Sequence, residues 1–387
     1  MVHSSFGLPW PGAGDEFLLR PGVAFLNHGS FGACPKPVFD AYQAWQRELE
    51  EQPVEFLARR INTLLAEARS RLGSFIGADS DNLVFVPNAT YGVNIAARSF
   101  DLAPGDEVLA TDHEYGATDR IWRFICGQRG ANYVRRPIPL PLPGDAEIVE
   151  ELWRGVTGRT KVIFMSHITS PTAVIFPVAE ICKRARDAGI ITVIDGAHAP
   201  GQVELALEEL GADFYTGNCH KWLCAPKGAG FLYAPRDRQA LLQPLVVSWG
   251  WESETPGPSR FIDYFSWAGT SDPSAYFSVS AAIEYQNEHN WAEVREACHK
   301  LAVWARRRLA AVIGMPLICV EDSFVQMFSI ELPPGSIERL GMRLWDEYQV
   351  EVPMVRWNGR ELMRVSIQAY NRVGDVERLE AALRAIL

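Results

Sequence analysis

A lysine, Lys221, occupies a stretch that otherwise predicts a protein core. It lies between His220 and Trp222 in the segment DFYTGNCHKWLCAPKGAGFLY, residues 213–233, whose two ends are apolar. Burying an ammonium group without a partner is so unfavourable that the group tends to lose its proton instead. A neutral lysine amine is a nucleophile, so this position is a candidate for covalent catalysis.

A carboxylate closes another apolar run, where Asp195 follows the strand-like residues 190–194 in IITVIDGAHAPG. Ligands of open α/β sheets gather at the carboxyl ends of the strands, so this side chain should lie at the ligand edge, partly shielded from water. The competing interpretation is a helix N-cap, a position at which Asp is favoured.

Two further segments follow strand-like runs. In LVFVPNATYGVNIAARS a strand ends at Pro87 and a helix begins near Ala89 and Thr90. A helix N-terminus offers free amides and a positive dipole end to a phosphate, although Thr90 as a plain cap is the simpler alternative. His113, in the loop TDHEYGA, supplies an aromatic ring, but a lone histidine is more often structural than functional.

These features together meet the requirements of one cofactor, pyridoxal 5'-phosphate (PLP). The lysine, 26 residues after Asp195, can hold the aldehyde as a Schiff base, and the carboxylate can keep the pyridine nitrogen protonated. The helix N-terminus can bind the phosphate, and an aromatic ring can stack on the cofactor. Glycine-rich nucleotide motifs and the HExxH zinc motif are absent from the sequence.

Between about residues 80 and 235, short β-rich runs alternate with helical stretches, which predicts a mostly parallel sheet with helices on both faces. The predicted strands are residues 83–86, 107–110, 161–165, 190–194 and 228–234. Long helices followed by strands in FVQMFSIELP and LMRVSIQAYN predict a second, α+β domain. We expect an N-terminal segment at 1–60, a large cofactor-binding domain at 61–270 and a small C-terminal domain at 271–387.

Composition and charge restrict the partners. The chain has 387 residues, is 48% hydrophobic and carries a net charge of -10, so it can bury a large core but lacks the basic face that nucleic acid requires. No apolar run reaches the length of a membrane span, and the first residues do not resemble a signal peptide. The seven cysteines form no zinc-binding CxxC pair, so we expect reduced thiols, no metal and a cytoplasmic protein.

Several motifs occur together in an order that resembles one family. They are FLNHGSFGACP, DGAHAPG, DFYTGNCHKWL, AGTSD and LMRVSIQAYN. The chain resembles the isopenicillin N epimerase-like branch of the class V aminotransferases, which are PLP enzymes of fold type I. The resemblance implies a large domain with a mostly parallel seven-stranded sheet flanked by helices, a smaller C-terminal α+β domain, and a homodimer with shared active sites.

The resemblance also assigns roles to individual residues. It implies that Lys221 is the Schiff-base lysine, that Asp195 is the partner of the pyridine nitrogen and that His113 stacks on the cofactor ring. Further cofactor contacts are implied for Ala89, Thr90, Ser170, His198, Asn218, His220 and, from the second subunit, Thr270. The implied substrate contacts are Asn27, His28 and Arg364. The arginine would clamp the α-carboxylate of an amino-acid substrate in a bidentate pair.

PLP permits several reactions at an amino acid, and the resemblance favours an epimerase or racemase. Lys221 would remove the Cα proton on one face, and His113 or His28 would serve the other face. A C–S lyase and an aminotransferase remain alternatives. A cysteine desulfurase does not fit, because the loop before Arg364, YQVEVPMVRWNGRELMR, contains no cysteine. A binding protein that has lost catalysis is the last alternative, and the retained Lys221 and Asp195 argue against it.

Overall fold

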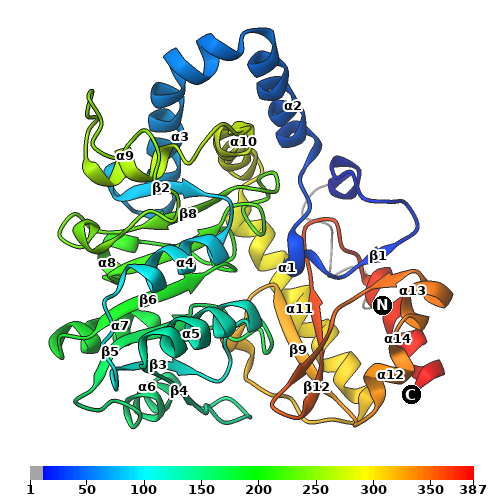
Figure 1. The fold of residues 1–387 in the computed structure, drawn as a ribbon. Helices are drawn as coiled ribbons and strands as arrows, with labels where there is room; N and C mark the ends of the chain where they lie inside the picture. The colour runs from blue at the N-terminus through cyan, green and yellow to red at the C-terminus, as the bar shows by residue number, and fades with distance from the viewer. Residues whose placement is uncertain (1–11) are drawn as a thin grey trace.

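The central sheet carries most of the residues singled out above. The computed structural model describes residues 12–387, and the sheet has seven strands in the order β2-β8-β7-β6-β5-β3-β4 (Figure 1). The strands are β2 (Leu83–Val86), β3 (Glu107–Thr111), β4 (Asn132–Arg136), β5 (Thr160–Ser166), β6 (Ile191–Gly196), β7 (Phe214–Asn218) and β8 (Gly230–Tyr233). β8 runs antiparallel to both neighbours, and the other adjacent pairs are parallel. The expected mostly parallel sheet is therefore confirmed.

Both faces of this sheet are buried, which explains the continuous apolar runs. In β5, Val162 and Phe164 face one hydrophobic core, whereas Ile163 and Met165 face the other. The helices of this region are α3 (Ile61–Ile76), α4 (Ala89–Ser99), α5 (Gly116–Arg129), α6 (Asp145–Trp153), α7 (Val178–Asp187), α8 (Leu207–Leu210) and α9 (Arg260–Ser266). Helices α4 and α5 pack into the first core, and α3 and α7 pack into the second.

The C-terminal part of the chain forms a second layer of helices on a small sheet. Its antiparallel strands lie in the order β11-β12-β9, with β9 at Met327–Leu332, β11 at Met354–Trp357 and β12 at Arg360–Ser366. Its helices are α10 (Ser274–Glu288), α11 (Trp291–Ile313), α12 (Ser336–Leu340), α13 (Arg343–Tyr348) and α14 (Val373–Ile386). This α+β arrangement agrees with the expectation for the C-terminal region.

The N-terminal segment connects the two parts. Strand β1 (Ala24–Phe25) pairs in parallel with β10 (Val350–Glu351), so the beginning of the described chain is tied to the C-terminal part. Helix α1 (His28–Phe31) follows β1 and lies beside the small sheet (Figure 1), and α2 (Lys36–Glu51) packs against α10. Of the expected N-terminal segment at 1–60, residues 1–11 lie outside the described part.

Candidate active site

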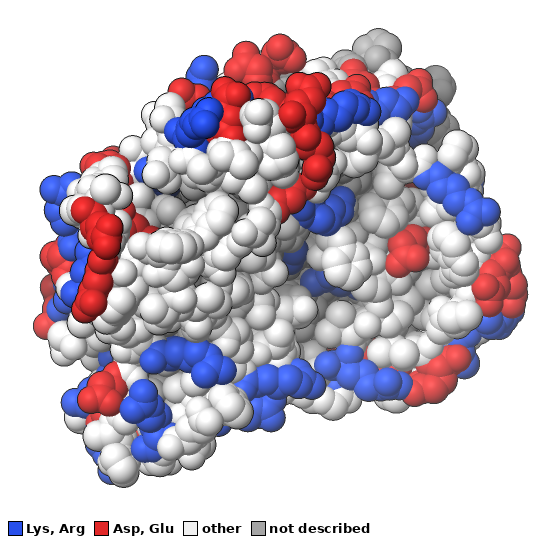
Figure 2. Space-filling model, turned by 45° about the horizontal axis from the view of Figure 1, so that its top comes forward, with Lys and Arg blue, Asp and Glu red and all other residues white. Residues whose placement is uncertain are grey.

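The candidate site lies where the carboxyl ends of the central strands meet the C-terminal part. Ser166, Asp195 and Thr216 are adjacent across β5, β6 and β7. Arg364 on β12 reaches this edge, because its guanidinium donates to the backbone oxygen of Ser170, four residues after the end of β5. Figure 2 shows a hollow in this face of the molecule with basic side chains inside it.

The Lys221 amine loses its proton much more readily than an ordinary lysine amine does. It follows β7 by three residues, and burial lowers its pKa to about 7, with the positive charge of Arg364 adding to the effect and Asp195 opposing it. Its Nζ lies 3.3 Å from Nε2 of His198. Trp222 donates its indole N–H to Nδ1 of His198, which leaves the imidazole proton on Nε2, pointing to the amine. His198 can therefore donate a hydrogen bond to the Lys221 amine whenever that amine is unprotonated.

His28 supports the backbone of Lys221 and does not face a pocket. Its Nε2 is 3.0 Å from the Lys221 carbonyl oxygen, so this nitrogen carries the proton, and its Nδ1 is 3.0 Å from the Tyr370 hydroxyl. The side chain is fully buried, and burial lowers the pKa of His28 to about 3. Because both ring nitrogens are engaged, this arrangement does not favour His28 as a substrate contact or as a base on the second face.

Asp195 is a buried carboxylate whose protein partners leave one oxygen available. Its Oδ1 accepts from the amide of Ala197 at 2.9 Å, and within residues 12–387 the other oxygen has no hydrogen-bond donor. Burial raises the pKa of Asp195, whereas the Ala197 amide and the Lys221 charge lower it. The chain turns after β6 without starting a helix, so the alternative of a helix N-cap does not apply. The free oxygen suits a protonated ring nitrogen.

The N-terminus of α4 offers hydrogen-bond donors to an anion. Its cap is Asn88, whose Oδ1 accepts from the Tyr91 amide at 2.9 Å, so Thr90 is not the cap. In the described chain the Thr90 hydroxyl has no hydrogen-bond partner, which leaves it for a ligand. Asn218 accepts from the Ala89 amide at 2.8 Å and thereby joins the end of β7 to the helix.

His220 borders the same region. Its Nδ1 donates to the carbonyl oxygen of Ala229 at 2.8 Å, and burial lowers the pKa of His220 to about 4. Its other ring nitrogen has no partner within residues 12–387. This nitrogen is the one that could contact a ligand beside α4.

Arg364 is a buried cation with no carboxylate partner in the described chain. Nη1 donates to the Ser170 backbone oxygen at 2.7 Å and to its hydroxyl at 3.0 Å, and Nη2 donates to the Ser30 hydroxyl at 3.0 Å. Its Nε is buried without a partner. Burial lowers the pKa of Arg364 to about 10, although the nearby Tyr115 phenol opposes this effect. A buried guanidinium without a counter-ion is unfavourable, so a carboxylate ligand would stabilise this site.

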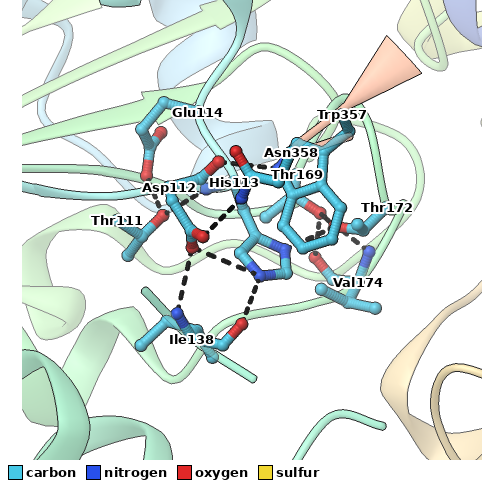
Figure 3. A network of polar contacts seen from close by, with 10 residues as sticks. All are labelled: Thr111, Asp112, His113, Glu114, Ile138, Thr169, Thr172, Val174, Trp357 and Asn358. Atoms are coloured by element: carbon cyan, nitrogen blue, oxygen red, sulfur yellow. Dashed lines mark hydrogen bonds and ion pairs between the residues drawn. The ribbon is translucent and has the colours of Figure 1, made fainter. Parts of the chain in front are cut away.

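His113 lies in a polar network beside the candidate site (Figure 3). Its Nε2 donates to the Ile138 carbonyl oxygen at 2.9 Å, and its Nδ1 is 2.7 Å from the Thr172 hydroxyl. The side chain is fully buried, and burial lowers its pKa. The ring packs against Trp357, with ring centroids 4.5 Å apart. This placement gives His113 a structural environment and does not favour its predicted roles in stacking and proton transfer.

The remaining predicted residues have different surroundings. Ser170 contacts Arg364, as described above. Asn27 precedes α1 and donates to Glu351 at 3.1 Å, and its own Oδ1 is buried without a partner. Thr270 is exposed on the loop between α9 and α10, at the edge of a cavity of about 260 Å³.

The structure adds three residues that the sequence did not single out. Ser30 contacts Arg364, and Tyr115 is a 47% exposed ring near the same guanidinium. Glu114 is buried, and its carboxyl accepts from Thr111 at 2.5 Å and from the amide and hydroxyl of Ser166 at 2.9 and 2.6 Å. Burial raises the pKa of Glu114 to about 8, and the negative charge of Asp195 adds to the increase.

Two general expectations can be compared with the described residues. All seven cysteines are free, as expected for reduced thiols. Among residues 12–387, we find no helix that has both the length and the apolar character needed to span a membrane.

Known proteins resemble this chain in sequence and in fold. The family described as Aminotransferase class-V matches residues 30–379. Isopenicillin N epimerase of Amycolatopsis lactamdurans is 36% identical, with 97% of this chain and 98% of that protein covered. L-cysteine desulfhydrase of Arabidopsis thaliana is 29% identical, with 95% and 88% covered. A mutant of C-DES with glycine covalently linked to its PLP cofactor has a similar fold, with a TM-score of 0.84 at 22% identity, 95% of this chain and 97% of that chain being covered.

The residues at the candidate site fit PLP. The cofactor requires an amine that is readily deprotonated, a carboxylate with one free oxygen and a helix N-terminus for its phosphate, and the site provides all three. The matched family covers most of the chain, including all of the central sheet. The chain therefore belongs to the class V aminotransferases and is a PLP-dependent enzyme.

Proposed function

We propose that this enzyme is an epimerase or racemase that acts at the Cα atom of an amino acid with a free α-carboxylate. The observation that carries the proposal is the buried Arg364 guanidinium, which lacks a counter-ion in the described chain and lies close enough to Lys221 to lower the pKa of its amine. A substrate carboxylate at Arg364 would neutralise the buried charge. It would also bring the Cα–H bond of the substrate toward the Lys221 amine.

The cofactor would be held by residues at the ends of three strands. Lys221 would bind it covalently, the free oxygen of Asp195 would face its ring nitrogen, and Thr90 and His220 would contact its phosphate, with Asn218 fixing the helix end. When bound, PLP withdraws electrons from the Cα atom of the substrate and makes its proton acidic. The Trp222 indole donates to Nδ1 of His198 and so keeps the imidazole proton on Nε2, which faces the Lys221 amine.

Lys221 suits the removal of that proton. A general base works best when its pKa lies near the operating pH, and burial lowers the pKa of Lys221 to about 7. On the second face, His113 and His28 have both ring nitrogens engaged. We therefore propose Tyr115, an exposed phenol near Arg364, as the residue to examine for the second proton transfer.

A C–S lyase is the second candidate, and the similarity to L-cysteine desulfhydrase favours it. The same Lys221 base and the same Arg364 contact would serve β-elimination, which needs no group on the second face. An aminotransferase activity would also use these two residues. The three activities differ in where the Cα proton returns.

Assembly and location belong to the same proposal. We propose a homodimer in which Thr270 reaches the phosphate site of the partner subunit, because this residue is exposed on the loop between α9 and α10. Each interface of such a symmetric dimer would complete two sites. A cytoplasmic location stays a prediction from the sequence.

The test measures the fate of the Cα proton. A panel of L-amino acids is first screened for a change in the visible absorbance of the cofactor, and the responding amino acid is then incubated with enzyme in heavy water. An epimerase places deuterium at Cα in both enantiomers and forms neither keto acid nor ammonia. Stoichiometric keto acid with a released sulfur product would establish the lyase instead, and an amine form of the cofactor that persists until keto acid is added would establish the aminotransferase.

A further inference from the structure

The tip of the β11–β12 hairpin contacts the loop that follows β3 (Figure 3). Trp357 donates its indole N–H to the backbone oxygen of Asp112 at 2.7 Å, and Asn358 donates its amide to Oδ2 of the same residue at 2.5 Å. Oδ1 of Asp112 accepts from the Ile138 amide at 3.0 Å. Both oxygens of this carboxylate are therefore used, one within the sheet part and one toward the C-terminal part.

His113 extends this contact to a third segment. Its ring lies between Trp357 and the Thr172 hydroxyl, which is 2.7 Å from Nδ1 of His113 and also 2.7 Å from the Thr169 hydroxyl. Thr169 is in turn bonded to Val174 through its backbone and its hydroxyl. The loop at 169–174 is thus held in one conformation by hydrogen bonds that begin at the hairpin tip.

The same loop holds Arg364. Two residues before Thr172, the backbone oxygen and the hydroxyl of Ser170 accept from Nη1 of Arg364, and the next residue, Pro171, accepts from the Ser329 hydroxyl of β9 at 2.9 Å. These contacts therefore fix both the backbone and the side chain of Arg364. Its strand is held at the hairpin tip, and its guanidinium is held by the loop that His113 supports.

The β11–β12 hairpin is regular, so a displacement of its tip would also displace β12. Asn358 and Gly359 both have positive φ angles, 47° and 77°, as in the two-residue turns that match the twist of paired strands. β11 and β12 pair in continuous register from Trp357 with Arg360 to Met354 with Met363. A displacement of the tip would therefore be carried along β12 toward Arg364.

We propose that Trp357 and Asn358 are positioning residues that, through Asp112 and His113, hold Arg364 at the place where it binds the substrate carboxylate. This inference rests on the carboxylate role of Arg364 proposed above. It assigns to His113 the function of supporting the junction, by which we mean the contacts of Trp357 and Asn358 with Asp112 and His113. Neither Trp357 nor Asn358 needs to touch the substrate for the inference to hold.

The main variant is Asn358→Gly. A positive φ angle suits glycine, so the turn keeps its shape and only the side-chain bond to Asp112 is lost. Trp357→Phe is the second variant, because it keeps an aromatic ring on His113 and removes the indole N–H. Glu338→Gln is the matched control, since Glu338 is exposed and pairs with Arg356 on the same hairpin.

Two readouts are measured on the PLP-loaded protein. The first is the dissociation constant of 2-methylalanine, which has the α-carboxylate but no Cα proton, followed through the cofactor absorbance. We expect both variants, Asn358→Gly and Trp357→Phe, to raise it about fivefold, as the loss of one ordinary hydrogen bond predicts. The second is hydrogen–deuterium exchange of the amides at 354–364, which should become faster by a similar factor. The control should leave both readouts unchanged.

Arg364→Lys separates this inference from the proposed function. If it weakens 2-methylalanine binding while both junction variants bind the probe as tightly as the wild type, the positioning role is overturned and the carboxylate role stands. An Arg364→Lys variant with unchanged binding overturns the carboxylate role, and the inference with it. Equal effects of Glu338→Gln and Asn358→Gly would show a nonspecific response of the hairpin and would also overturn the inference.

Discussion

Replacing Glu114 by glutamine should change how the stability of the folded protein depends on pH. The Glu114 carboxyl is buried, accepts hydrogen bonds from Thr111 and Ser166, and lies near the charge of Asp195. Burial raises its pKa from 4.5 to about 8, so the folded protein binds this proton more tightly than the unfolded chain does. Glutamine is a neutral side chain of nearly the same shape that cannot titrate.

The magnitude follows from the pKa. Because the pKa of Glu114 is raised on folding, its protonation contributes stability that is complete below pH 4.5 and is lost as the pH rises through about 8. A pKa difference of one corresponds to about 1.4 kcal/mol, so the total change approaches about 5 kcal/mol between these pH values. Relative to Glu114→Gln, the wild type should therefore lose about 1.4 kcal/mol of unfolding free energy for each pH unit in this window.

The assay is urea unfolding of the cofactor-free protein, followed by far-ultraviolet circular dichroism at several pH values from 5 to 8.5. The readout is the difference between wild type and variant in the free energy of unfolding, so a constant cost of the new amide group in the site does not affect the slope. Glu338→Gln serves as the control, because it makes the same chemical change at an exposed carboxylate. Parallel pH curves for wild type and Glu114→Gln would refute the reasoning about the buried carboxyl.

Two further predictions concern the cofactor. Lys221→Ala should abolish the covalent attachment of PLP, so that borohydride reduction fixes PLP to the peptide containing residue 221 only in the wild type. Turnover should fall by at least about 1000-fold, because the base and the covalent anchor are lost together. Equal labelling of another lysine would contradict the assignment. Thr270→Ala should weaken PLP binding about three- to tenfold in an equilibrium titration, while the molar mass measured by light scattering stays that of the wild type. A wild-type protein that binds PLP with full affinity as a monomer would rule out a contact across a dimer interface.

Much of the central sheet could be predicted because its strands are buried on both faces and read as continuous apolar runs. Two strands were not predicted. β4, with the sequence NYVRR, is an edge strand whose residues are partly exposed, so it lacks an apolar run. In β7 the apolar pattern is interrupted by Thr216 and Gly217, and the space beside Thr216 is filled by the close approach of Gly92 on α4. These requirements come from packing between distant segments, which a local pattern does not contain.

The site was predictable where a residue's role depends on its own chemistry. Lys221 and Asp195 are charged residues in apolar stretches of the sequence, whereas Arg364 was assigned from the family resemblance. The structure places the three near one another, with Asp195 and Arg364 buried and part of the Lys221 residue exposed. His113 and His28 are different, because the role of a histidine depends on the partners of its two ring nitrogens. Those partners are the Ile138 carbonyl, 25 residues away, and the Tyr370 hydroxyl, 342 residues away. Without the fold, neither partner could be anticipated.

The contacts of His28 also bear on the order of events during protein synthesis. His28 joins the backbone of Lys221 to Tyr370, and the neighbouring β1 pairs with β10 near residue 350. The loop that carries the reactive amine is thus supported from both sides by segments made at very different times. While the ribosome is still translating the C-terminal part, the sheet can fold but the lysine loop lacks this support. We therefore expect a nascent chain that stops before residue 350 to be unable to retain PLP, even though its central sheet is complete.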